Sequence, residues 1–193
     1  MKKNLLIAIW MTLATTVVLG IIYPLVVTGL AQVLFPRQAN GEMIQRADGK
    51  FAGSSLIGQP FSSRGYFHSR PSAAGPVGYD PMTSGGSNLG PTNKALLDRV
   101  SSSVQALQAE NPDGRIPVDL ATASGSGLDP HISPAAADFQ VARVARERGM
   151  TEREVRALVK EHSEDRQFGF LGEPRVNVLD LNLDLDSKHP VKR

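Results

Sequence analysis

Residues 5–27 read LLIAIWMTLATTVVLGIIYPLVV, and no charged side chain occurs anywhere from Asn4 to Pro36. A bilayer core needs about 20 apolar helical residues, so this run predicts a transmembrane helix within an N-terminal region of residues 1–36. A cleavable signal peptide is the alternative, because Lys2 and Lys3 form a basic start and residues 29–31 (GLA) resemble a cleavage site. Its apolar core spans about 7 to 15 residues, which is shorter than this run.

The flanks of this helix indicate its orientation. Two lysines and the α-amine crowd a three-residue tail, whereas the basic residues after Pro36 are spread out and mixed with acidic ones. Cytoplasmic flanks concentrate Lys and Arg. We therefore expect the N-terminus in the cytoplasm and residues 37–193, a single soluble domain, on the extracytoplasmic side.

Small side chains recur every four residues along the predicted helix, at Ala8, Thr12, Thr16 and Gly20. Residues four apart share a helix face, and small ones let a second membrane helix approach closely. The stripe is a candidate helix-packing interface, although such residues are common in membrane spans anyway. A single span without an intramembrane charge cannot itself carry ions.

Composition excludes several classes of function. The chain has no Cys, which removes thiol catalysis, disulfide scaffolds, Cys-based zinc sites and iron–sulfur clusters. Its pI of about 9.0 comes from Lys2 and Lys3, because 19 basic residues face 19 acidic ones beyond residue 36. No basic patch for nucleic acid is therefore indicated.

The first half of the soluble domain is rich in loops. Residues 37–52 predict a connector that enters a hairpin with its turn at Asp48-Gly49, and short strands are expected at 54–59 and 66–70. Residues 53–91 hold 8 Gly and 5 Pro. They also hold four of the eleven aromatic residues, which disordered linkers usually lack, so we expect ordered loops.

The second half predicts helices from their caps. Asn93 or Thr92 starts a helix that ends at residues 111–114, and Ser133-Pro134 starts another that Gly149 ends. Thr151 and Glu154 form a capping box. Residues 116–122 are a strand candidate, and 175–186 form either a bulged strand or a short strand followed by a helix capped by Asn177. The fold class is α+β, with about three helices on a small sheet.

Direct signals of chemistry are weak. Ser126, Asp129 and His131 would suit a membrane-anchored extracytoplasmic hydrolase, but the G-x-S-x-G elbow is absent. Residues 180–186 imitate the start of a calcium loop without its Gly and final Glu, and we expect their polar side chains to form a solvated face. Residues 83–87 (TSGGS) are similar to part of the ATP-binding-cassette signature, and a turn is the expected role.

Five blocks of the sequence together resemble one family. They are residues 53–61 (GSSLIGQPF), 66–72 (YFHSRPS), 86–93 (GSNLGPTN), 118–134 (VDLATASGSGLDPHISP) and 171–183 (LGEPRVNVLDLNL). In this order, after one N-terminal span, they are similar to the potassium-transporting ATPase C subunit (KdpC) family. The signature positions, whose roles the resemblance leaves open, are Gln59, Phe67, Arg70, Pro71, Asn88, Gly90, Asn93, Ser124, Gly125, Ser126, Gly127, Asp129, His131 and Ser133.

The resemblance implies a non-catalytic accessory subunit of a high-affinity, ATP-driven potassium-uptake complex in the bacterial inner membrane. Such a subunit aids assembly and acts as a catalytic chaperone that raises the ATP affinity of the P-type ATPase subunit. The implied partners are that subunit, a channel-like potassium-binding subunit, a small helical peptide and membrane lipid. ATP and potassium are ligands of the complex, and no cofactor or metal site is expected in this chain. A domain outside the cytoplasm would act on ATP indirectly; a domain that binds ATP directly, the remaining alternative, would have to be cytoplasmic.

Overall fold

The computed structural model describes residues 1–45 and 49–190, and it divides into two compact units. The first unit lies within Met1–Ala52 and the second begins at Gly53.

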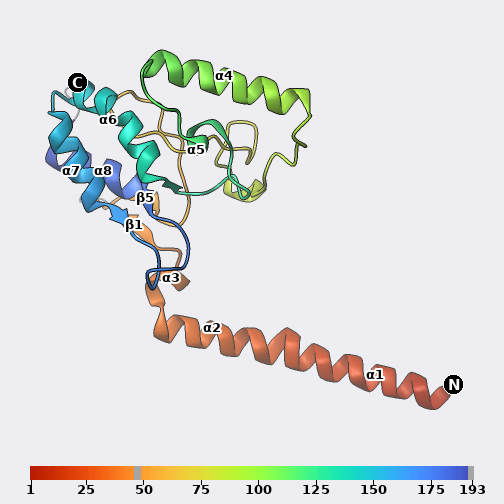
Figure 1. Ribbon diagram of the computed structural model, residues 1–193. Helices are drawn as coiled ribbons and strands as arrows, with labels where there is room; N and C mark the ends of the chain where they lie inside the picture. The colour runs from red at the N-terminus through yellow and green to blue at the C-terminus, as the bar shows by residue number, and fades with distance from the viewer. Residues whose placement is uncertain (46–48, 191–193) are drawn as a thin grey trace. The chain divides into compact units, whose positions relative to one another are not determined.

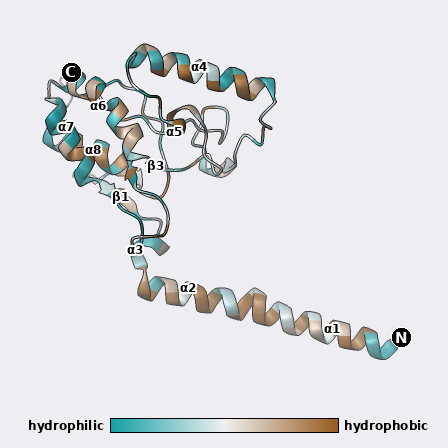
Figure 2. Cartoon of the chain, viewed as in Figure 1, coloured by the Kyte–Doolittle hydropathy of each residue, from teal (hydrophilic) through white to brown (hydrophobic). Residues whose placement is uncertain are grey.

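The first unit is dominated by one long helix. It consists of α1 (Lys2–Val17), a π-helical turn η1 (Val18–Ile22) and α2 (Tyr23–Leu34). Hydrophobic residues, coloured brown in Figure 2, recur along most of its length, and none of its residues is buried. Of the helices in the described ranges, only this one, with 33 residues, is long and apolar enough to cross a membrane.

The π-helical turn ends at Ile22, two residues before Pro24. Proline has no N–H, and its ring clashes with the carbonyl four residues earlier in an α-helix. Here the helix widens for one turn, and the N–H of Tyr23 donates to the carbonyl of Val18. The span therefore continues past the proline without a break.

A short helix and two paired strands follow the long helix, and the second strand runs into the start of the second unit. They are α3 (Pro36–Ala39), β1 (Met43–Gln45) and β2 (Phe51–Ser54), and the two strands are neighbours in a two-stranded sheet. The expected turn at Asp48-Gly49 falls partly on Asp48, which lies outside the described residues. The strand expected at 54–59 is wrong, since β2 ends at Ser54 and residues after it turn back, with the N–H of Ile57 donating to the carbonyl of Ser54.

The second unit has the predicted α+β class. Its helices are α4 (Lys94–Glu110), α5 (Val118–Ala121), α6 (Pro134–Arg148), α7 (Glu152–Glu161) and α8 (Val178–Lys188), with a 3₁₀ turn η2 at Pro81–Thr83. Its three strands are β3 (His131–Ile132), β4 (Ser163–Glu164) and β5 (Arg175–Asn177). They form an antiparallel sheet in the order β3-β5-β4, with Ile132 opposite Val176.

The core lies where α6, α7 and α8 pack on one another and on the sheet (Figure 1). Its fully buried side chains include Phe67, Ile132, Val141, Val144, Val155, Val176, Leu181 and Leu185. Helix α4 has no buried residue, and its partly buried Leu107 packs against this core.

The helices begin and end at the predicted caps. The side chain of Ser133 accepts from the N–H of Ala136, and α6 ends at Gly149 with φ 65°. Thr151 and Glu154 form the capping box of α7, and Asn93 caps α4. For residues 175–186 the second alternative is confirmed, because a short strand is followed by a helix capped by Asn177.

Two strand predictions are wrong in the second unit. Residues 66–70 run as irregular chain, because side chains rather than a neighbouring strand satisfy their backbone. Residues 116–122 alternate apolar and polar side chains, but Val118–Ala121 form the short helix α5, which buries the adjacent residues Leu120 and Ala121.

Candidate functional site

The segment around Phe67 is held by two amide side chains that replace a neighbouring strand. Asn182 of α8 accepts from the N–H of Phe67 and donates to its carbonyl, both at 2.9 Å. Gln140 of α6 does the same for His68, at 2.8 and 3.2 Å. Backbone groups buried without partners are costly, so these two amides fix the course of the loop-rich segment. Asn182 was expected on a solvated face, but its side chain is buried, which corrects that prediction.

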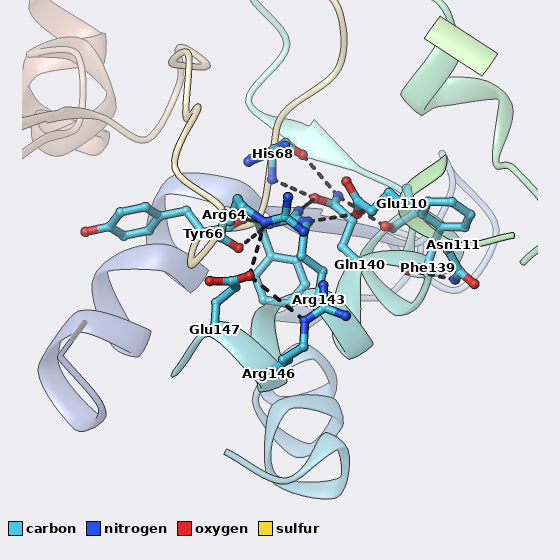
Figure 3. A network of polar contacts seen from close by, with 12 residues as sticks. Arg64, Tyr66, His68, Glu110, Asn111, Phe139, Gln140, Arg143, Arg146 and Glu147 are labelled. Carbon is cyan, nitrogen blue, oxygen red and sulfur yellow. Dashed lines mark hydrogen bonds and ion pairs between the residues drawn. The ribbon is translucent and has the colours of Figure 1, made fainter. Parts of the chain in front are cut away.

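Two buried arginines of α6, Arg143 and Arg148, complete this frame. Figure 3 shows the contacts of Arg143. Arg143 donates to the carbonyls of Arg64 and Tyr66 and pairs with Glu110 at 2.8 Å. Arg148 donates to the carbonyl of Gly65 at 2.5 Å and lies 4.8 Å from the centre of the Tyr66 ring. Guanidinium groups suit such places because they offer five donors and stack on aromatic rings.

Charge and burial around this frame shift the pKa of His68. Its Nε2 lies 3.0 Å from the carbonyl oxygen of Ser63. Burial lowers the pKa of this imidazole, and the positive charge of Arg143 acts in the same direction. The ring is therefore neutral at neutral pH, and its hydrogen bond to Ser63 requires the proton on Nε2.

Three of the signature side chains meet in one cluster. Asp129 accepts from a guanidinium nitrogen of Arg70 at 3.1 Å, and its other oxygen lies 3.3 Å from Nδ1 of His131. Burial alone would raise the pKa of Asp129, but the hydrogen bonds from His131 and the charge of Arg70 outweigh it and hold the pKa below its ordinary value. The cluster borders a cavity of about 660 Å³, which Ser133 also lines.

The carboxylate of Asp129 also accepts a hydrogen bond from the free edge of the sheet. Strand β3 is an edge strand, and the N–H groups of His131 and Ser133 point to the side away from β5. Asp129 accepts from the first at 3.0 Å and Asp119 from the second at 2.7 Å. The two acids thereby satisfy donors that would otherwise attract a further strand.

Two stretches rich in Ser and Gly, residues 83–87 and 124–127, pack against each other. The N–H of Gly85 donates to the carbonyl of Ser126 at 2.7 Å, and the hydroxyl of Ser84 donates to the same oxygen at 3.2 Å. Gly127 has φ 68°, and a Cβ there would lie 2.8 Å from the carbonyl oxygen of Gly85. A Cβ on Gly86 would lie 3.1 Å from the carbonyl oxygen of Gly125. This close backbone approach gives both stretches a role in turns and packing.

The serines of this loop support its turns. The hydroxyl of Ser124 accepts from the N–H of Gly127 at 3.0 Å, and that of Ser126 accepts from the N–H of Leu128 at 3.1 Å. Over residues 1–45 and 49–190 no hydrogen bond joins Ser126 to His131, whose Nδ1 faces Asp129. The geometry therefore does not assemble the nucleophile and base that the hydrolase alternative needs.

The other predicted positions are dispersed. The carbonyl of Gln59 accepts from the hydroxyl of Ser69, and Pro71 lines a separate hollow beside Tyr79. Asn88 has φ 52°, and the carbonyl of Gly90 accepts from the N–H of Asn93. On the long helix, the stripe positions Ala8, Thr12, Thr16 and Gly20 are all exposed.

Sequence reasoning missed the residues that hold the frame, namely Gln140, Arg143, Arg148 and Asn182. A signal was present, because these polar residues lie among the buried apolar residues of α6 and α8. Buried polar side chains at such positions need partners, and a long loop-rich segment elsewhere in the chain could have supplied them.

Comparison with known proteins decides the family. A family model described as the K+-transporting ATPase, c chain (KdpC), matches residues 5–187. The chain belongs to the KdpC family. Among KdpC relatives, the potassium-transporting ATPase KdpC subunit of Koribacter versatilis is 62% identical over 191 residues, which cover 99% of this chain and 98% of the relative. The KdpC subunit of Methylococcus capsulatus is 59% identical over 182 residues, covering 93% and 95%. The KdpC subunit of Geobacter sulfurreducens is 55% identical, covering 97% and 100%.

Proposed function

We propose that this chain is the accessory C subunit of an ATP-driven potassium-uptake complex in a bacterial inner membrane and has no catalytic site of its own. The family match carries the proposal, because it includes both the apolar helix and the folded domain. The relatives are named as subunits of a potassium-transporting ATPase. The Asp129 cluster supports a structural role, since its carboxylate is engaged by Arg70, by His131 and by the edge of β3.

The proposed role is to aid assembly and to raise the ATP affinity of the P-type ATPase subunit as a catalytic chaperone. The other proposed partners are a channel-like potassium-binding subunit, a small helical peptide and surrounding lipid. With the domain in the periplasm, its effect on ATP passes through partner helices as a coupling free energy. Such couplings amount to about 1–3 kcal/mol, or roughly 5–150-fold in affinity.

Purification from native membranes in mild detergent tests this function. The tagged chain should bring with it a P-type ATPase and a channel-like subunit, and the preparation should hydrolyse ATP in response to potassium. A complex assembled without this chain should show a higher KM for ATP or fall apart. Recovery of the chain alone would refute the proposal.

Labelling of a single cysteine tests which side of the membrane the domain occupies. The chain has no natural Cys, and Ser187 is exposed on α8. In intact cells, a membrane-impermeant maleimide should label Ser187→Cys as strongly as it does in lysed cells. Labelling only after lysis would place the domain in the cytoplasm and would revive direct ATP binding.

A further inference from the structure

The hairpin between β4 and β5 ends in a well-formed tip. Residues 168–170 make a three-residue loop, closed by hydrogen bonds in both directions between the backbones of Gln167 and Leu171, each at 2.9 Å. An ion pair between Arg166 and Glu173 at 2.6 Å braces the hairpin below this closure. Hydrogen bonds and an ion pair within the hairpin therefore fix the backbone on which the tip stands.

This tip presents its apolar side chains to solvent. Phe168 is 87% exposed, Phe170 71% and Leu171 47%. Single exposed apolar residues such as Val77 and Met82 are ordinary on a protein surface. Here two phenylalanines and a leucine lie within four residues, and such a group of exposed apolar side chains indicates an interaction site. We call residues 168–171 the Phe tip.

The backbone of the Phe tip has a strained residue at Phe168. Phe168 has φ 53°, a left-handed conformation that side chains with a Cβ rarely adopt, and Gly169 follows with φ 80°. Such strain persists where the surrounding structure enforces it, and it is concentrated at functional sites.

The charges below the tip distinguish a protein partner from a lipid surface. Glu164, Asp165 and Glu173 outnumber Arg166 and Arg175, and both arginines are held in ion pairs, Arg175 with Glu164 at 2.8 Å. A tip that enters an anionic membrane gains from free basic residues beside it. Exposed aromatics with paired charges beside them instead match a protein interface, which has aromatic residues at its centre and a polar rim.

We propose that the Phe tip inserts into an apolar pocket on a neighbouring subunit of the transport complex. The proposal rests on the proposed function, since it needs that complex to exist. It assigns the binding contact to Phe168 and Phe170, with the two ion pairs at the rim.

Paired serine substitutions test this contact in the full complex. Both rings are exposed, so Phe168→Ser with Phe170→Ser should leave thermal unfolding of the chain unchanged. We expect at least a tenfold lower recovery of the partner subunits in detergent. Met82→Ser, which removes another side chain that is 88% exposed, is the matched control and should keep wild-type recovery. Equal recovery from the double variant and the control would overturn the proposal.

Phe170→Cys identifies the occupant. A photocrosslinker attached there should join the chain to one partner subunit, and a fluorophore there should be insensitive to brominated lipids in nanodiscs. Quenching by brominated lipids would overturn the proposal in favour of bilayer insertion. If the wild-type chain recovers no partner at all, the proposed function itself fails. If the wild-type chain and the tip variants recover the partners equally well, the proposed function stands and the assignment of the contact to the tip fails.

Discussion

Arg148 and Arg146 lie two residues apart on one helix and have opposite environments. The side chain of Arg148 is fully buried and bonded to Gly65, His189 and Asp186, whereas that of Arg146 is 64% exposed. Arg148→Met leaves several acceptors without a donor, and it should lower the free energy of unfolding by roughly 3 kcal/mol. Arg146→Met should cost less than about 1 kcal/mol. Urea unfolding of the full chain in detergent measures both, and equal effects would contradict the buried frame.

His68 makes stability depend on pH near neutrality. Its folded-state pKa is lowered by burial and by Arg143, so below about pH 6.5 the unfolded chain binds more protons than the folded one. The contribution of His68 is complete above that pH and is lost as the pH falls toward the lowered pKa. Melting temperatures between pH 8 and pH 5 should therefore drop less in His68→Gln than in wild type. The exposed His189→Gln serves as the control, and a slope unchanged by His68→Gln would refute this account.

At the scale of elements, local chemistry decided which predictions succeeded. The helices over 94–110, 134–148 and 152–161 were predictable because their caps lie within a few residues of the turns that they stabilise. The strands expected at 54–59 and 66–70 failed because a short stretch of sequence does not show what its backbone bonds to. At Phe67 and His68 the partners are Asn182 and Gln140, more than 70 residues away, and the N–H of Gly58 donates to the carbonyl of Leu128.

The Asp129 cluster was predictable only as a set of residue types. The motif around residues 124–134 identified Asp129 and His131, but Arg70 comes from a different block, and only folding brings it to the carboxylate. The sequence also could not show that Asp119 and Asp129 act together on one strand edge.

Two glycines of the loop at residues 124–127 should differ in how well they tolerate a side chain. Gly127→Ala combines a left-handed φ with a contact of 2.8 Å to the carbonyl oxygen of Gly85, and it should destabilise the domain by roughly 2–4 kcal/mol. A Cβ on Gly125, two residues earlier, meets nothing within 4 Å, so Gly125→Ala should change stability by about 0.5 kcal/mol or less. Thermal unfolding compares them, and similar losses would show that the loop tolerates side chains at both positions.

At the scale of the whole molecule, the membrane helix should take part in assembly. The stripe of Ala8, Thr12, Thr16 and Gly20 remains a prediction, and Thr16→Leu with Gly20→Leu should lower recovery of the partner subunits several-fold. Ala14→Leu enlarges a small residue away from the stripe and should have little effect. Quantitative mass spectrometry of the purified complex gives the ratio, and unchanged recovery in the double variant would remove the stripe from the account.

The long helix exceeds the thickness of the hydrocarbon layer of a membrane. Its 33 residues rise about 50 Å, whereas hydrocarbon covers about 30 Å. Even a tilt of about 40°, the upper end of the usual range, leaves a vertical rise of about 38 Å. At least a full turn of the helix thus lies outside the hydrocarbon, at the level of the lipid headgroups or beyond. We expect partner subunits to cover this surplus in the complex and an orphan copy to expose it, which would let quality-control proteases distinguish the two.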